Sequence, residues 1–234
     1  MKRMAAYHQM AILPFKAEDG VAPFLSPQSI DFLHNMRQVE LINNVNEMTA
    51  GTAFEGKTLY DTVYASSQDP TQAALANNAS QAWNIDFFLQ ALTNDQQPPS
   101  GLLQQTISQN FGSFERFQTV FNANALSIFG NGWTWLVMNQ GGKLSVMNTY
   151  SATCPFTAIP SNNRDDVQGV TYSTIQRAHS QRPFVKLLPV LGLSMWQEAF
   201  LPDYGLDRQS YVNNFWNVVN WQTVDERMVT SGNK

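Results

Sequence analysis

Residues 129–138 read FGNGWTWLVM, and this stretch carries the clearest strand signal in the chain. Residues 132–138 are rich in aromatic and branched side chains, which favour β-structure. Residues 140–142, Gln-Gly-Gly, predict a turn, and residues 143–149 then alternate between apolar and polar side chains as the second strand of a hairpin does. A further strand is predicted at 187–193. The second half of the chain is therefore expected to contain a small sheet.

The residues before this sheet predict two long helices joined as a hairpin. Ser26 followed by Pro27 is a typical helix start, a side-chain cap and then a proline at the first helical position. Gly51 is a plausible helix end, and a second helix is expected over 71–92, followed by a polar linker at 94–101. Apolar residues recur in the first helix with a period close to 3.6, at Ile30, Leu33, Leu41, Val45 and Met48.

Shorter helices are predicted around the strands, at 114–129, 195–200 and 210–219. The stretch 157–186 is polar and has no clear periodicity. A long segment of this kind is either functional or disordered, so both readings stay open.

Composition limits the classes of protein to which the chain can belong. Its 234 residues suffice for one domain or for two lobes that share a core. The net charge of -4 is unlike that of a strongly basic nucleic-acid binder. The single cysteine excludes an internal disulfide and a CxxC zinc site. The first residues are basic but too short for a signal peptide, and they could be the remainder of a longer targeting segment.

Several segments, in the right order, resemble the iron/manganese superoxide dismutases, and the resemblance extends from about residue 13 to residue 227. The matching segments are 51–59, 77–84, 129–137, Trp196 with 203–204, and 215–221. The resemblance implies an α+β fold with an N-terminal α-hairpin, followed by an α/β lobe with a three-stranded antiparallel sheet. We therefore expect a helical hairpin domain at 10–97 and a C-terminal domain at 98–234, with an extended insertion at 157–186.

The resemblance also implies where a metal would bind. Family members hold iron or manganese, which cycles between two oxidation states, with three histidines and one aspartate. The matching positions are Leu33, Ile85, Ser194 and Glu198. Two of these side chains are hydrocarbons, a serine hydroxyl is a poor neutral ligand, and a single carboxylate does not make a site. We therefore expect no metal and no other cofactor at these positions.

Neighbouring residues are not expected to replace the missing ligands. His34 and Asp86 stand next to two of these positions, but one step along a helix turns a side chain by about 100°. They are expected to be solvent-facing polar residues. The other histidines, His8 and His179, lie outside the resembling core. The sequence also lacks the motif of a nucleophile elbow, a phosphate loop or a dinucleotide-binding turn.

Positions around the implied metal are altered as well. Arg37 and Leu41 stand where the family places a histidine and a tyrosine near its substrate funnel. Gln197 and Leu201 stand where a glutamate and a tyrosine link the two subunits of family dimers. Gln81 matches an outer glutamine that the family retains. The resemblance therefore implies a family scaffold without the family's chemistry.

From this pattern we predict a structural component of the mitochondrial small ribosomal subunit, located in the mitochondrial matrix and not an enzyme. The chain resembles the superoxide-dismutase-like proteins of fungal mitochondrial small subunits, which lack the metal site. Two alternatives stay open. The chain could be a pseudoenzyme that pairs with another complex, or an atypical metal-dependent superoxide dismutase with a rebuilt site.

The partners expected are other mitochondrial ribosomal proteins and a related superoxide-dismutase-like chain, which would form a heterodimer across the face that carries Gln197 and Leu201. The alternative is that this face is solvated. Limited contact with ribosomal RNA or an acidic protein is expected from a locally basic set in the insertion, and no membrane contact is expected. The members of that set are Arg164, Arg177, Arg182 and Lys186.

One ion pair is predicted. Arg37 lies four residues after Leu33 and four before Leu41, so it shares their apolar face. An inward-pointing arginine needs a partner, because an unpaired buried charge is very costly. We predict that Arg37 pairs with Glu198, directly or through one water, and so helps to join the two lobes. The alternative is that its head group extends along the surface into water.

Overall fold

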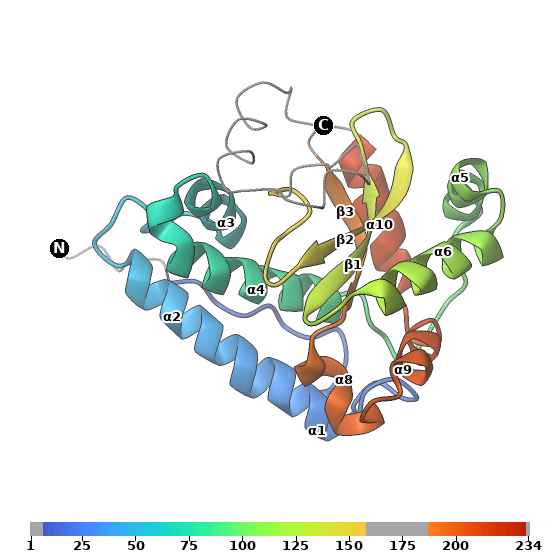
Figure 1. Cartoon of the computed structure of the whole chain (residues 1–234), viewed down its shortest axis with the longest axis horizontal. Coiled ribbons are helices and arrows are strands. Elements are labelled where there is room, and N and C mark those ends of the chain that lie inside the picture. Colours follow the sequence, from blue (N-terminus) through green and yellow to red (C-terminus); the bar gives the residue numbers. More distant parts are fainter. Residues whose placement is uncertain (1–6, 158–186, 233–234) are drawn as a thin grey trace.

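The chain forms a layer of long helices packed against a lobe built on a small sheet (Figure 1). The computed structural model describes residues 7–157 and 187–232. The helical segments there are η1 (Ala17–Asp19), α1 (Pro27–Ile30), η2 (Asp31–Gln38), α2 (Val39–Thr49), α3 (Leu59–Ser67), η3 (Pro70–Gln72), α4 (Ala73–Leu89), α5 (Gly101–Phe111), α6 (Phe114–Ser127), α8 (Gln197–Tyr204), α9 (Arg208–Phe215) and α10 (Trp221–Gly232). The strands are β1 (Gly132–Met138), β2 (Leu144–Tyr150) and β3 (Leu188–Ser194). This α+β arrangement, with an N-terminal α-hairpin, confirms the predicted fold class.

The first long helix is a continuous rod made of α1, η2 and α2, and it lies along α4 (Figure 1). It begins as predicted: Ser26 Oγ accepts a hydrogen bond from the Ser29 amide at 3.2 Å, and Pro27 takes the first helical position. It ends at Thr49, and Gly51 follows with φ of 70°, a conformation that glycine adopts without strain. Local capping therefore places both ends of the rod.

The rod is not a regular α-helix, because η2 is π-helical over eight residues. The predicted apolar stripe is otherwise confirmed: its first four members, from Ile30 to Val45, are buried. The prediction for Met48 was wrong, since this side chain is 36% exposed. Thr49 lies four residues after Val45 and takes the inward place, so Met48 is turned outward by one helical step.

Helices α3, α5 and α10 were not predicted from the sequence. The α3 helix shows why. Thr58 Oγ1 caps it by accepting from the Asp61 amide at 3.0 Å, but the helix buries only Thr62, Val63 and Ser66. Two of these three residues are polar, so no apolar stripe marks the helix in the sequence. Packing against α4 supplies the missing stabilisation.

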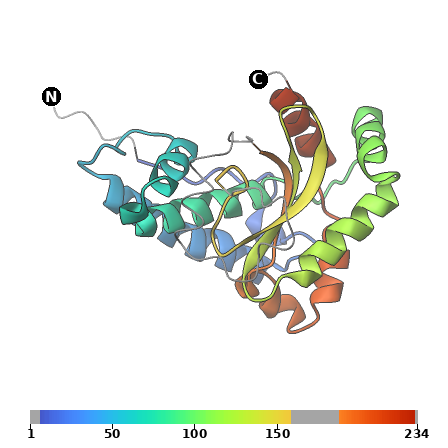
Figure 2. The same ribbon diagram turned by 45° about the horizontal axis from the view of Figure 1, so that its top comes forward.

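The sheet has the order β2-β1-β3, and β1 pairs antiparallel with both neighbours. The predicted strands agree with the observed ones to within one residue at each end. All of β1 is buried. Helix α6 packs on β1 and β2, while α4 and α10 pack on β3 (Figure 2). A central strand covered by helices reads as a continuous apolar run, which is the pattern that marked it in the sequence.

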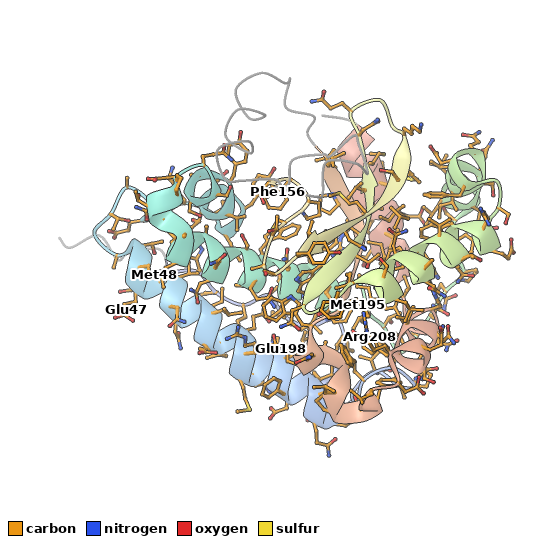
Figure 3. All side chains as sticks on the ribbon, viewed as in Figure 1. Glu47, Met48, Phe156, Met195, Glu198 and Arg208 are labelled. Carbon is orange, nitrogen blue, oxygen red and sulfur yellow. The ribbon has the colours of Figure 1, made fainter. Side chains whose placement is uncertain are left out.

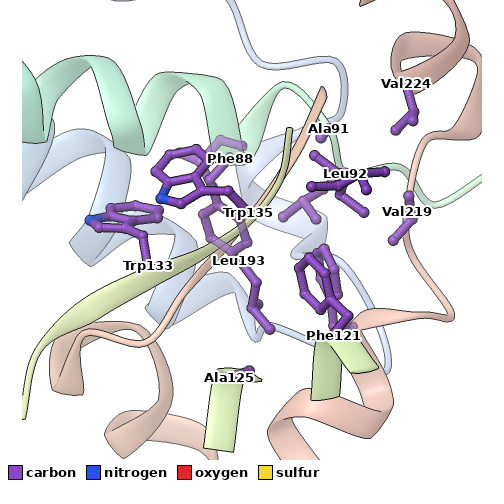
Figure 4. Packing of buried hydrophobic residues seen from close by; sticks show 14 of the residues in the cluster. Phe88, Ala91, Leu92, Phe121, Ala125, Trp133, Trp135, Leu193, Val219 and Val224 are labelled. Carbon is purple, nitrogen blue, oxygen red and sulfur yellow. The ribbon is translucent and has the colours of Figure 1, made fainter. Parts of the chain in front are cut away.

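Two tryptophans of β1 form the centre of the core (Figure 4). The rings of Trp133 and Trp135 stack with centroids 5.5 Å apart, and Phe88 of α4 meets Trp133 edge-on at 6.1 Å. Gly192 of β3 lies opposite Trp135, and a β-carbon added there would be only 2.5 Å from the indole ring. The absence of a side chain at this glycine therefore makes room for the indole.

The predicted insertion at 157–186 lies outside the described residues, apart from Thr157. None of the helices in the described ranges has both the length and the apolar character that a membrane span requires.

Replacing Gly192 with alanine should destabilise the fold. The new methyl group has to displace a fully buried indole, and overpacking of this kind costs about 1–3 kcal/mol. Gly101→Ala is the matched control, because no atom lies within 4 Å of an added β-carbon at that helix start. Urea unfolding should show a lower midpoint for Gly192→Ala only. Equal midpoints for the two variants would contradict the packing argument.

Candidate functional site

The four positions of the implied metal come from separate parts of the chain and lie where the two lobes meet. Leu33 is on η2, Ile85 on α4, Ser194 at the end of β3 and Glu198 on α8. Helix α4 packs on both η2 and β3. Glu198 lies where α8 approaches the first long helix (Figure 3). The fold therefore builds a centre from both lobes at this place.

The side chains at these positions do not fit a redox metal. Leu33 and Ile85 are each 2% exposed and belong to the hydrophobic core. Ser194 Oγ accepts from the Trp196 amide at 3.3 Å and offers only a neutral hydroxyl. Glu198 is left as a single carboxylate. Within residues 7–157 and 187–232, no three histidine, cysteine, aspartate or glutamate side chains are grouped so that they could hold a metal ion.

The adjacent polar residues point elsewhere. His34 hydrogen-bonds with Asn35 through Nδ1 at 2.9 Å, and its Nε2 lies 3.5 Å from the carbonyl oxygen of Ala11 in the N-terminal segment. Asp86 accepts from Gln38 Nε2 at 3.5 Å. Neither residue joins Glu198 in a cluster of possible ligands. The prediction that these residues are solvent-facing is wrong for both, because His34 and Asp86 are each half-buried.

The predicted ion pair between Arg37 and Glu198 is confirmed as a direct contact. Arg37 Nε lies 3.5 Å from Glu198 Oε1, and Arg37 Nη1 donates to Glu40 Oε2 at 2.8 Å. The side chains of Arg37 and Glu198 are 27% and 19% exposed, whereas that of Glu40 is 59% exposed. The guanidinium group therefore bridges one surface carboxylate and one inner carboxylate.

Burial raises the pKa of Glu198, while the Arg37 charge and hydrogen bonding from Gln81 and Arg37 oppose this shift. Gln81 is 2% exposed, and its Oε1 accepts from Trp133 Nε1 at 3.3 Å. An indole N–H can only donate, so this contact assigns the amide oxygen to Trp133 and leaves Gln81 Nε2 as the donor toward Glu198. Trp133 in the core of the sheet thus orients the Gln81 side chain of the site.

A cavity of about 220 Å³ adjoins this cluster. Arg37, Gln81 and Trp196 line it together with Leu41, further residues of α4 and the two residues that follow β2. The sequence indicated the positions of Arg37 and Leu41 near the funnel, but gave no signal for the size of this space.

Sequence reasoning missed Arg227 of α10. Its guanidinium lies 3.6 Å from the centroid of the Phe87 ring, and its Nη2 donates to the carbonyl oxygen of Phe87 at 2.9 Å. Burial lowers the pKa of Arg227 to about 10, an effect that the charges of Asp86 and Glu226 oppose. Burial likewise raises the pKa of Asp86, with Gln38, Arg227 and His34 opposing the shift. The apolar run of α4 hid this polar region in the sequence.

Some of the remaining predicted contact residues belong to the described part of the chain, and the others lie outside it. Gln197 and Leu201 lie on α8. The backbone N–H of Gln197 donates to Asn131 Oδ1 at 3.2 Å, and Leu201 is 39% exposed. The four basic residues predicted to contact RNA lie outside the described residues: Arg164, Arg177, Arg182 and Lys186.

Comparison with known proteins shows similarity over almost the whole chain. The model of the alpha-hairpin domain of iron/manganese superoxide dismutases matches residues 7–93, and that of their C-terminal domain matches 99–162 and 163–227. The iron superoxide dismutase of Escherichia coli K12 is 32% identical over 94% of this chain and 97% of its own length. Those of Bacteroides fragilis and Coxiella burnetii are 31% and 32% identical over 94% and 91% of this chain, and over 99% and 93% of their own lengths.

These comparisons contradict the predicted function. The curated relatives are named as iron superoxide dismutases, and nothing in the comparisons supports a ribosomal component. The prediction that the chain is not an enzyme is contradicted by the same relatives. The relatives are bacterial proteins, so they also give no support to the mitochondrial assignment. The prediction infers loss of the activity from the loss of family side chains at the metal positions, and the relatives oppose that inference.

The pH dependence of stability should reveal the burial of Asp86. Because its pKa is raised in the folded state, the protonated carboxyl favours folding, and that contribution is lost as the pH rises through the folded-state pKa. The free energy of unfolding of the native chain should therefore fall relative to that of Asp86→Asn as the pH rises above about 4, the ordinary pKa of an aspartate.

Asp207→Asn is the control of opposite sign. Hydrogen bonds from Ser210 lower the pKa of Asp207, so its contribution to stability is lost as the pH falls. Urea unfolding at several pH values should give opposite trends for the two variants. The same trend in both would contradict the burial of Asp86.

Proposed function

The chain belongs to the iron/manganese superoxide dismutase family, and from this we propose that it acts as an atypical metal-dependent superoxide dismutase. One observation carries the proposal. The similarity to iron superoxide dismutases covers 94% of this chain and 97% of the Escherichia coli protein, so it includes both lobes and not one shared domain.

The structure places one condition on this activity. Leu33, Ile85, Ser194 and Glu198 do not supply a donor set for iron or manganese. The redox metal that dismutation needs must therefore be held by ligands other than these four side chains. The side chains at these four positions argue against a bound metal, whereas the relatives argue for dismutase activity. Direct measurement of metal content and activity decides between the two.

We expect the protein purified from cells supplied with iron or manganese to retain metal and to show dismutase activity. Chelation should remove both, and adding the metal back should restore both. The Escherichia coli relative, treated in the same way, is the positive control. Metal content is measured by elemental analysis, activity by inhibition of superoxide-dependent dye reduction, and folding by circular dichroism.

A folded protein with neither bound metal nor activity, beside an active control, would overturn the proposal. Activity that survives the change Glu198→Gln would show that the metal does not depend on the one carboxylate at the four positions. Loss of metal together with activity in that variant would instead contradict the statement that the metal is held by ligands other than these four side chains.

We also propose that the α8 face binds a second, related chain. Leu201 is 39% exposed on this face. The Asn131 contact with Gln197 brings the loop of Phe129, which is 95% exposed, next to α8. Large apolar side chains exposed on neighbouring segments support a protein contact.

Leu201→Lys should weaken this association, because a charged side chain would be desolvated at the contact. Leu102→Lys on α5 is the control, since Leu102 is also exposed but lies on a helix far from α8 (Figure 1). Sedimentation of the chain with its co-expressed partner should show dissociation for Leu201→Lys and an intact complex for Leu102→Lys. Equal behaviour of the two variants would rule out the α8 face.

A further inference from the structure

Helix α8 is attached to the N-terminal helices at both of its ends. At its C-terminal end, Asp203 Oδ2 accepts from the Ser26 amide at 2.9 Å, and Tyr204 Oη donates to the carbonyl oxygen of Phe24 at 2.7 Å. At its N-terminal end, the contact is the Arg37–Glu198 pair. The first attachment involves residues just before α1, against which α8 also packs, and the second is made to η2 farther along the rod.

The buried polar atoms around the Arg37–Glu198 pair are complementary as hydrogen-bond donors and acceptors. Arg37 Nε, Gln81 Nε2 and Glu198 Oε1 are all inaccessible to solvent and have no partner at ordinary hydrogen-bond length. Two of these atoms are donors and one is an acceptor. Because solvent cannot reach any of them, only their mutual contact offsets the cost of burying them.

The orientation of Gln81 is set independently of Glu198. Trp133 Nε1 holds the amide oxygen, so the amide nitrogen must be the group that faces the carboxylate. Arg37 approaches Glu198 from η2, while Gln81 approaches it from α4. Donor groups from both long helices of the hairpin therefore face a single carboxylate on α8, with only the Arg37 contact close enough for an ion pair.

We propose that Arg37, Gln81 and Glu198 form a metal-free polar clasp that fastens the C-terminal lobe to the helical hairpin. The clasp lies at the place where the resemblance puts a metal that would join the same two lobes. It gives this chain an inter-lobe link whose strength does not depend on a bound cation. The guanidinium also places a positive charge beside that position, which disfavours a cation there.

A double-mutant cycle with Arg37→Met and Glu198→Leu tests the clasp. Each single variant leaves a partner without its counter-charge and should lower the melting temperature by roughly 4–8 °C, since both groups keep some contact with solvent. The double variant should melt close to the single variants, because the second change removes a group that has already lost its counter-charge and otherwise only the exposed contact with Glu40 or the contact with Gln81. All measurements are made with and without a chelator, which should not alter the coupling between Arg37 and Glu198.

Arg37→Met with Glu40→Gln is the matched control cycle. It uses the same arginine with its exposed carboxylate partner and should show little coupling. If Arg37→Met or Glu198→Leu fails to fold, Glu198→Gln and Gln81→Leu provide a second cycle that keeps the side-chain volume. Additive effects in the Arg37–Glu198 cycle, or a coupling that disappears when metal is chelated, would overturn the proposal. The readout is stability, so it does not depend on dismutase activity.

Discussion

The packing of Trp133 and Trp135 in β1 is the contact on which the rest of the structure depends. These two fully buried rings lie at the centre of the sheet, where Phe88 of α4 contacts Trp133 and Phe87 of the same helix contacts Trp135. Gly192 on the neighbouring strand leaves the space that the second indole fills. Large aromatic side chains provide most of the apolar area that a core of this size can bury. The relative placement of the two lobes follows from this packing.

The same core also organises the polar centre between the lobes. Trp133 holds the oxygen of Gln81 and so turns its nitrogen toward Glu198. Leu33 and Ile85 extend the apolar core to the edge of this centre, where Arg37 supplies the positive charge. The family scaffold is thus combined with a set of side chains that suits an ion pair better than a redox metal. This contrast separates what the relatives indicate about activity from what the residues indicate about ligands.

Sequence reasoning succeeded where one local physical rule decides the outcome. The cap at Ser26 and Pro27 and the strands around residues 132–138 are examples. It failed where packing overrides a weak local pattern, as in α3, whose buried residues are mostly polar. It also failed for Arg227, because a charged residue buried beside Phe87 and α4 cannot be recognised before the helices are placed. The pairing of Arg37 with Glu198 was predictable, since an arginine within an apolar stripe needs a partner.

The sequence by itself determined the long helices and the three strands in their order along the chain, because these depend on hydrophobic periodicity and capping, which are local. Its resemblance to a known family implied the fold class and the four positions at which a metal would bind. Only the tertiary structure decided that Gln81 faces Glu198, that Asp86 turns toward Gln38 and that a cavity adjoins Arg37. The reason is physical: the direction and burial of a polar side chain are set by neighbours from distant segments, and these become neighbours only when the lobes pack together.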